Sequence, residues 1–439
     1  MFVLSYAGSA LASCAAMCAC QACGFAARET FRKSARLAYC VLFTLAMVLA
    51  WVLRDFARPL MEKIPWIFHH ASTDPSDEWY GQQAVYRVSM GNFMFFGLLS
   101  AVLVGVRYKS DKRDQYLQHG GWFVKITLWL LCNALPFFFP VSVVNAYSWA
   151  ARFGSGAFLI VQMIILLDLT QSWNDSWVAK EDNRYLYALL GITLGAYVGA
   201  ATLAGLLFWL FAPSGSECSF NICMITLTLV LCLAFSLLSL HPSAQNGSLF
   251  PSAVITLYCT YLCYSALQSE PHNYPCNGVG HKYTAASATT LAAGMLLTLL
   301  SVVYSALRAG SNTQTFMTSG YSEPDAAPEQ PLLEAEEGTS AGLDGEAPGA
   351  AAGDKRGDKA ISEFETVTYS YSFFHLIFAL ASMYIAMLMT GWGTGAEEKD
   401  LIDVGWTSVW VKLASQWLTA LLYAWTLAAP LLFPDRTFG

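Results

Sequence analysis

The sequence predicts an all-α, polytopic membrane protein that crosses the bilayer about ten times. Hydrophobic residues make up 55% of its 439 residues, and charged residues make up only 13%. Soluble domains carry about 25% charged residues. A soluble domain of this size could not bury so much apolar surface and still present a water-compatible exterior. The composition therefore excludes an ordinary soluble enzyme, a fibrous protein and a disordered chain.

The negative charge of the chain is concentrated in one segment. Twelve acidic and three basic residues lie between Ala309 and Glu365, whereas the whole chain has a net charge of −7. This segment has too few apolar residues to offset the entropy of ordering, so we expect an acidic, disordered loop over 309–365. No long basic run occurs, which argues against a nucleic-acid partner.

Apolar runs locate the expected helices, because a spanning helix needs roughly 20 apolar residues. The ten candidate spans are Leu37–Leu53, Ala84–Val106, Gly121–Val144, Ala151–Ser176, Tyr185–Phe211, Asn221–Leu240, Pro251–Leu267, Tyr283–Leu307, Thr366–Thr390 and Val404–Leu432. An eleventh apolar run, Val3–Ala27, is a span, a re-entrant segment or an interfacial helix.

Four regions follow from these runs along the chain. They are an apolar, Cys-rich N-terminal segment with a basic loop (1–36), a helical bundle (37–308), the acidic loop (309–365) and the last two spans with a short tail (366–439).

The distribution of Lys and Arg among the loops predicts the orientation. Fifteen of them lie in the connections 28–36, 107–120, 177–184, 241–250 and 308–365 and in the tail after Leu432. Six lie in the alternate connections 54–83, 145–152, 212–220, 268–282 and 391–403. We therefore expect loop 309–365 and the C-terminus to be cytoplasmic, in the plasma membrane or in an endomembrane of the ER or Golgi.

Polar residues inside one apolar run are the candidate functional site. The stretch FLIVQMIILLDLTQSWNDSW places Gln162, Asp168, Ser172 and Asn174 in one predicted helix, with Asp168 and Ser172 on the same face. A helix from 151 to 179 would be about 43 Å long, longer than the hydrocarbon core, so it must tilt or project. Ionisable residues in a bilayer are biased toward function. The alternative is that Asp168 simply bonds a neighbouring helix.

Other residues within the predicted spans suggest packing rather than chemistry. Gly191, Gly195 and Gly199 repeat every fourth residue and predict a close helix contact. We expect Arg87, Lys125 and Lys412 to extend toward the membrane interface. We expect His375 to be a packing residue, with a proton relay as the alternative.

The twelve cysteines raise the possibilities of a disulfide and of a metal site. Cys218 and Cys276 lie in connections predicted to face an oxidising compartment, so we predict that they form a disulfide, with Cys223 as the competing partner. A zinc site at Cys14, Cys18, Cys20 and Cys23 is conceivable. Their apolar surroundings favour lipidation or packing, so we predict no metal.

No nucleotide-binding or hydrolase motif occurs. A Walker A sequence, a GxGxxG after a strand, HExxH and GxSxG are all missing from the chain. We therefore expect no cofactor, no enzymatic activity and no ATP-driven pumping, while passive movement of lipid or solute stays open.

Several stretches resemble the serine incorporator (SERINC) family, and they occur in one order over nearly the whole chain. The run from Phe158 to Val178 resembles the family signature Asp-Phe-x-x-Ser-Trp-Asn-Glu-Ser-Trp, with Leu169 in place of Phe and Asp175 in place of Glu. The stretches LSLHPSAQNGSLFPSAVITLYCTYLCYSALQSEP, SYSFFHLIFALASMYIAMLMTGW and WVKLASQWLTALLYAWTLAAPLL agree as well. The resemblance implies two helical subdomains crossed by long tilted helices, with a lipid-accessible groove between them.

The resemblance also implies lipid handling. Its most concrete form is ATP-independent scrambling of phospholipids between leaflets, with Gln162, Asp168, Ser172 and Asn174 lining or shaping the groove. The alternatives are a serine carrier or scaffold that supports phosphatidylserine and sphingolipid synthesis, and a trafficking protein without catalysis. The expected partners are membrane phospholipids, lipid-synthesis enzymes, and sorting adaptors that would bind a dileucine-like pattern at Leu332 and Leu333.

Overall fold

The computed structural model describes residues 35–64, 75–213, 215–241, 247–271, 274–277, 303, 367, 369–393 and 405–432. The regular elements in these residues are helices. The longer ones are α2 (Ala35–Phe56), α5 (Asp77–Val102), α6 (Trp122–Ala134), α7 (Val141–Val178), α8 (Asn183–Phe211), α9 (Ser219–Ser239), α10 (Leu249–Gln268), α15 (Tyr371–Met389) and α16 (Trp406–Leu432). The short ones are α3 (Arg58–Met61), the π-helix η1 (Asp114–His119) and the 3₁₀ turns η2 (Leu135–Phe138), η3 (Gly215–Cys218) and η4 (Gly391–Gly393).

Local sequence explains where several helices begin. Ser76 caps α5 by accepting a hydrogen bond from the Trp79 amide, and two acidic residues follow in the first turn. Ser370 caps α15 and Asp182 caps α8 in the same way. Such side chains satisfy amides that the first helical turn leaves unpaired.

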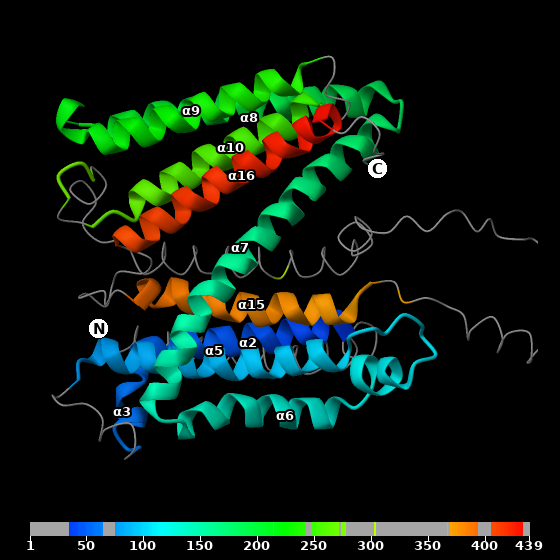
Figure 1. Cartoon of the computed structure of the whole chain (residues 1–439), viewed down its shortest axis with the longest axis vertical. Coiled ribbons are helices and arrows are strands. Elements are labelled where there is room, and N and C mark those ends of the chain that lie inside the picture. The colour runs from blue at the N-terminus through cyan, green and yellow to red at the C-terminus, as the bar shows by residue number, and fades with distance from the viewer. Residues whose placement is uncertain are drawn as a thin grey trace, which may run out of the picture.

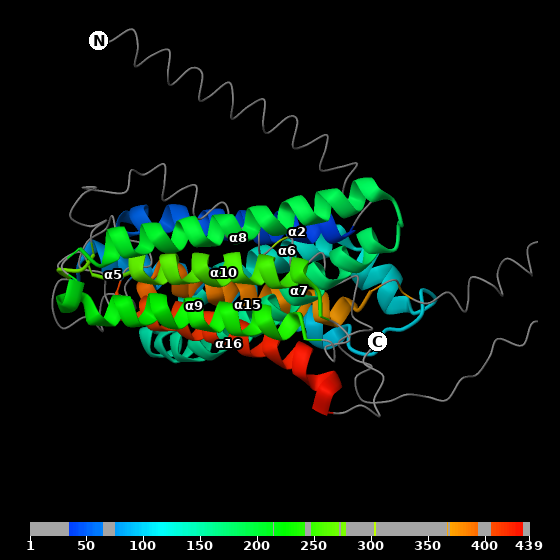
Figure 2. The same ribbon diagram turned by 90° about the horizontal axis from the view of Figure 1, so that it is seen from above.

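The helices form two bundles that α7 joins (Figure 1). The first bundle contains α2, α5, α6 and α15, and the second contains α8, α9, α10 and α16. Viewed from above, the helices of both bundles run along roughly the same direction (Figure 2). We call the side that holds α3 the α3 end and the opposite side, which holds η1, the η1 end. The chain runs back and forth between these two ends.

Helix α7 crosses obliquely from the α3 end of the first bundle to the η1 end of the second (Figure 1). Its 38 residues make it about 57 Å long. Val144, Ala151 and Phe158 belong to the core of the first bundle, whereas Leu166 and Leu167 pack against the core of the second. The structure therefore confirms the prediction that one overlong helix runs at a tilt to the others.

The surface has the character expected of a protein in lipid. Seven helices among the described residues are long and apolar enough to cross a membrane: α2, α5, α7, α8, α9, α10 and α15. Large apolar side chains point outward, and Phe123 and Phe153 keep 84% and 76% of their surface exposed. Outward-facing apolar residues of this size suit contact with acyl chains rather than water.

One predicted boundary is wrong. We expected a connection at 145–152 between the spans Gly121–Val144 and Ala151–Ser176, but α7 is continuous through those residues. The break lies at Phe139 and Pro140, after α6 and η2. Proline lacks an amide hydrogen and holds the preceding residue in an extended conformation, so the new helix can begin only after it.

The glycine repeat in α8 makes little contact with the helices that the structure describes. Within the described residues, nothing lies within 4 Å of a Cβ placed at Gly191 or Gly195, and both are exposed. A Cβ at Gly199 would make an ordinary 3.5 Å contact with Leu257. The buried face of α8 is formed instead by Thr193, Ala196, Ala200, Ala204 and Leu207.

The predictions for 1–27, Tyr283–Leu307 and the acidic loop 309–365 fall outside the described residues, apart from Val303. The last two spans are described, and they separate in space. Helix α15 packs in the first bundle and α16 in the second.

Candidate functional site

A polar stripe runs along α7 toward the η1 end. Asp168, Gln171, Ser172 and Asp175 recur at helical spacing and share one face. Asp168 and Gln171 are half-buried, and Ser172 and Asp175 are exposed. The Gln171 amide donates a hydrogen bond to Asp175 Oδ1 at 3.2 Å. The stripe therefore presents two carboxylates and two neutral polar groups on one face of the crossing helix.

Asn174 lies beside this stripe and is turned toward α10. Its side chain is buried, its Nδ2 donates to Asp175 Oδ1 at 3.1 Å, and its Oδ1 accepts from Ser248 Oγ at 2.8 Å. The ring of Trp173 packs edge-on against Phe250 of α10. Asn174 thus shapes the stripe by fixing α7 to the start of α10, and it does not line an open surface.

Gln162 is separated from the other predicted residues. It is half-buried, and it precedes Asp168 by six residues, or about 9 Å along the helix. A rotation of 100° per residue places Gln162 about 120° around the helix from Asp168. Of the four predicted residues, Asp168 and Ser172 therefore share a face, Asn174 supports it, and Gln162 lies apart.

A guanidinium group lies on the same helix toward the α3 end. Arg152 sits over the ring of Trp149, 4.6 Å from its centroid. No described side chain forms an ion pair or hydrogen bond with it, and its Nε is buried without a partner. The Tyr86 hydroxyl and Gly393 border the same space, since a Cβ at Gly393 would lie 2.9 Å from Arg152 Nη2 and 3.3 Å from the Tyr86 oxygen.

The turn beside Arg152 has an unusual backbone. Gly391, Trp392 and Gly393 all have positive φ angles, of 56°, 59° and 75°. This conformation is easy for glycine and strained for tryptophan, so the fold holds Trp392 there against its preference. The Tyr86 hydroxyl and Thr390 Oγ1 lie 2.9 Å apart and brace the turn against α5. Because residue 393 is glycine, the Arg152 guanidinium has space that any larger side chain at 393 would fill.

Sequence reasoning missed Arg152 because it assigned residues 145–152 to a loop. The useful indication was Pro140, which ends the preceding helical turn and places Arg152 in the fourth turn of α7. Gln171 was missed as well, although its spacing of three from Asp168 puts it on the same face.

Two further cations are buried in the first bundle. Arg87 has no exposed surface and donates to Gln83 Oε1 at 2.7 Å. Lys125 is 4% exposed, donates to the Gln118 carbonyl oxygen at 3.0 Å and lies 4.2 Å from the centroid of the Trp122 ring. The expectation that both extend to the membrane interface is therefore wrong. Their protein partners make them structural.

Gln118 of η1 connects several buried groups in that bundle. His375 Nε2 lies 3.0 Å from Gln118 Oε1, and Gln118 Nε2 donates to the Tyr369 hydroxyl at 2.9 Å. His375 is fully buried, which fits a packing residue. In the second bundle, Lys412 donates to Ser269 Oγ at 2.7 Å and to the Ser265 carbonyl oxygen at 3.2 Å.

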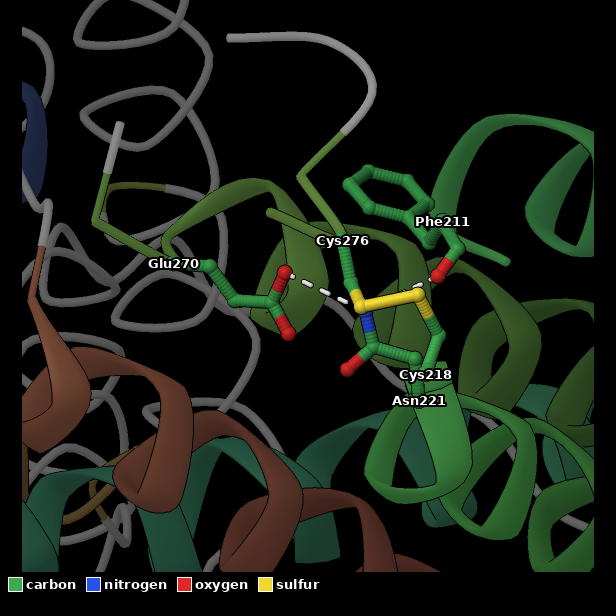
Figure 3. Close-up of a disulfide and its surroundings, with 5 residues drawn as sticks. All are labelled: Phe211, Cys218, Asn221, Glu270 and Cys276. Carbon is green, nitrogen blue, oxygen red and sulfur yellow. Dashed lines mark hydrogen bonds between the residues drawn. A yellow bond between two sulfur atoms is a disulfide. The ribbon is translucent and has the colours of Figure 1, made fainter. Parts of the chain in front are cut away.

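A disulfide closes the α3 end of the second bundle. The structure joins Cys218, just before α9, to Cys276, after α10 (Figure 3). Cys223 is an exposed free thiol. The described part of the chain contains no group of three His, Cys, Asp or Glu side chains placed to hold a metal ion. The four N-terminal cysteines lie outside the described residues.

Known proteins match the chain over nearly its full length. The family model "Serine incorporator (Serinc)" matches residues 10–436. A probable serine incorporator of Nematostella vectensis is 33% identical, with 98% of each chain covered. Serine incorporator 3 of Bos taurus is 31% identical over 81% of this chain and 80% of its own. Serine incorporator 2 of Homo sapiens is 30% identical over 86% of each. The chain is therefore a member of the serine incorporator family of membrane proteins.

Proposed function

We propose that this protein exchanges phospholipids between the two leaflets of a membrane without ATP. The observation that carries the proposal is the crossing helix α7. It joins the two bundles, bears a guanidinium toward the α3 end that forms no ion pair with the described residues, and carries a carboxylate-containing polar stripe toward the η1 end. The proposed activity makes and breaks no covalent bond, so it needs no catalytic residue.

The physical basis is the free energy of moving a polar headgroup through hydrocarbon. An unsatisfied polar group costs several kcal/mol in an apolar medium, and a charge costs more. A guanidinium can bind a phosphate through two parallel hydrogen bonds. The carboxylates of Asp168 and Asp175 suit the ammonium groups of headgroups that carry one. Exposed apolar side chains beside these polar groups, Phe153 next to Arg152 and Val178 near Asp175, would remain in contact with the acyl chains.

Lipid exchange in reconstituted vesicles tests the role of the stripe. Dithionite bleaches fluorescent lipid only in the outer leaflet, so exchange increases the bleached fraction. Asp168→Ala should slow this exchange, whereas Glu181→Gln, an exposed carboxylate just beyond α7, should leave it unchanged. If correctly folded Asp168→Ala protein exchanges lipid at the wild-type rate, Asp168 plays no part in the mechanism.

Arg152 has a matched test of its own. Arg152→Ala should slow exchange of phosphate-bearing lipids, and Arg152→Lys should restore part of the rate because it keeps the charge but loses the planar fork. Arg58→Ala is the control, because Arg58 is exposed at the α3 end and already pairs with Glu62 and Asp77 at 2.6 Å each. Equal rates for Arg152→Ala and Arg58→Ala would remove the proposed phosphate contact.

The same vesicles separate this function from the alternative of serine transport. Saturable accumulation of labelled serine without lipid exchange would favour a serine carrier. Exchange without serine accumulation would favour the proposal.

A further inference from the structure

A buried carboxyl group at the α3 end of the second bundle has one oxygen without a partner. Glu270 follows the end of α10 by two residues, and its side chain has no exposed surface. Its Oε2 accepts a hydrogen bond from Asn221 Nδ2 at 3.3 Å. Its Oε1 has no hydrogen-bond partner among the described residues. A buried carboxylate oxygen left in this state is energetically expensive.

The side-chain amide of Asn221, which donates to Glu270, also has an oxygen without a hydrogen-bond partner among the described residues. Asn221, in the first turn of α9, is also fully buried, and its Oδ1 is also without a partner. Its orientation is fixed, because Nδ2 donates to the Phe211 carbonyl oxygen at 3.0 Å. Rotating the amide by 180° would bring two acceptor oxygens together at Phe211. The carboxyl and carboxamide groups therefore face one another beside the disulfide with one acceptor each unsatisfied (Figure 3).

No described positive charge neutralises Glu270. Among the described residues, the titratable groups that interact with it are Tyr274 in the following loop and Cys263 on α10, and the nearest cation on α16, Lys412, contacts the adjacent Ser269. Lys412 donates to Ser265 and Ser269 instead. Burial raises the pKa of Glu270 to about 7, and the hydrogen bond from Asn221 opposes that rise.

We propose that Glu270 is a proton-binding site, in which its protonated carboxyl group forms a cyclic pair with the Asn221 amide. The Glu270 hydroxyl donates to Asn221 Oδ1 while Asn221 Nδ2 donates to Glu270 Oε2. A single proton thereby satisfies both orphaned oxygens. Loss of that proton leaves two unpaired acceptor oxygens facing each other in a buried site.

The position of the pair gives the proton a structural effect. The pair links the segment after α10 to the first turn of α9, and the Cys218–Cys276 disulfide links the same two segments. Asn277 Nδ2 also donates to the Glu270 carbonyl oxygen at 2.9 Å. Ionisation of Glu270 therefore weakens the polar contact between these two segments, while the Cys218–Cys276 disulfide continues to hold them together.

The sign of the pH dependence follows from the pKa. The folded protein holds the Glu270 proton more tightly than the unfolded chain, in which the carboxyl group has its ordinary pKa of 4.5. The stability that the pair contributes is thus fully present below about pH 4.5 and is lost as the pH rises through about 7.

Thermal unfolding of the purified full chain in detergent, followed by tryptophan fluorescence between about pH 5 and pH 8, tests the proposal. The wild-type midpoint should fall as the pH rises. Glu270→Gln should lose that part of the slope, because a glutamine amide supplies both hydrogen bonds at every pH. Glu217→Gln is the matched control, since Glu217 is exposed in η3 next to Cys218, and it should keep the wild-type slope.

Infrared spectroscopy gives a readout of the proton itself. The wild-type minus Glu270→Gln difference spectrum at about pH 5 should contain the carbonyl stretch of a protonated carboxylic acid, well below the pKa of the buried group. The wild-type minus Glu217→Gln spectrum should show less of it. An absent band, an unchanged slope in Glu270→Gln, or failure of Glu270→Gln to fold would each overturn the proposal.

Discussion

Helices α5 and α6 approach so closely at Gly91 that a single methyl group should separate them. A Cβ at Gly91 would lie 2.6 Å from Asn133 Cα and closer still to the Cys132 carbonyl oxygen. Both are backbone atoms of α6, so no side-chain rotation relieves the clash. Gly97 lies six residues along α5, where a Cβ would meet nothing within 4 Å among the described residues. Gly91→Ala and Gly97→Ala therefore form a matched pair on one helix.

The difference between these two variants can be worked out from the structure. Alanine gains about 1 kcal/mol over glycine inside a helix, and both variants receive that gain. Overpacking a tight contact costs about 1–3 kcal/mol, and only Gly91→Ala bears that cost. We expect Gly91→Ala to be less stable than Gly97→Ala by about 1–3 kcal/mol. Thermal or denaturant unfolding in detergent measures the difference, and equal stabilities would refute the close α5–α6 contact.

Three further predictions concern other parts of the molecule. Replacing Cys218 and Cys276 together by serine should destabilise the chain by about 2–5 kcal/mol, and a reductant should lower the unfolding midpoint of the wild type but not of this variant. Gln118→Leu should cost about 1–3 kcal/mol for each buried partner it leaves unpaired, while Gln115→Leu, exposed on the same π-helix, should be nearly neutral in the same unfolding assay. Deleting 320–360 should redirect the protein in cells if the dileucine-like pattern binds sorting adaptors; unchanged microscopy would dismiss that role.

The sequence predicts the all-helical membrane fold well because hydrocarbon imposes a simple rule on segment length and polarity. Each described helix longer than twenty residues overlaps a predicted apolar run, although α7 also continues through the predicted connection 145–152. The overlong helix through Asp168 was also predictable, since its length exceeds the hydrocarbon core and requires tilt.

Tertiary neighbours were less predictable. The sequence does not show that α15 and α16, adjacent in the chain, pack in different bundles. It also favoured the glycine face of α8 for packing, whereas the contact uses alanines whose small side chains serve the same purpose. Periodicity gives the face of a helix that is small or polar, but only the three-dimensional arrangement decides which face meets a neighbour.

The candidate site likewise has one part that local sequence predicts and another that depends on residues far along the chain. Helical spacing correctly places Asp168 and Ser172 on one face, because that relation is local. The buried position of Asn174 depends on Ser248, which lies far along the chain. Arg152 gains its significance from Tyr86 and Gly393, on two other helical segments, and no local pattern joins the three.

Lipid exchange by the purified wild-type chain in phospholipid vesicles, without ATP, is the decisive test of the proposed function. We predict that dithionite will bleach fluorescent lipid originally in both leaflets of vesicles that contain the protein. If bleaching stops at the outer-leaflet fraction, as in protein-free vesicles, while the protein remains folded, the proposed lipid-exchange function is contradicted.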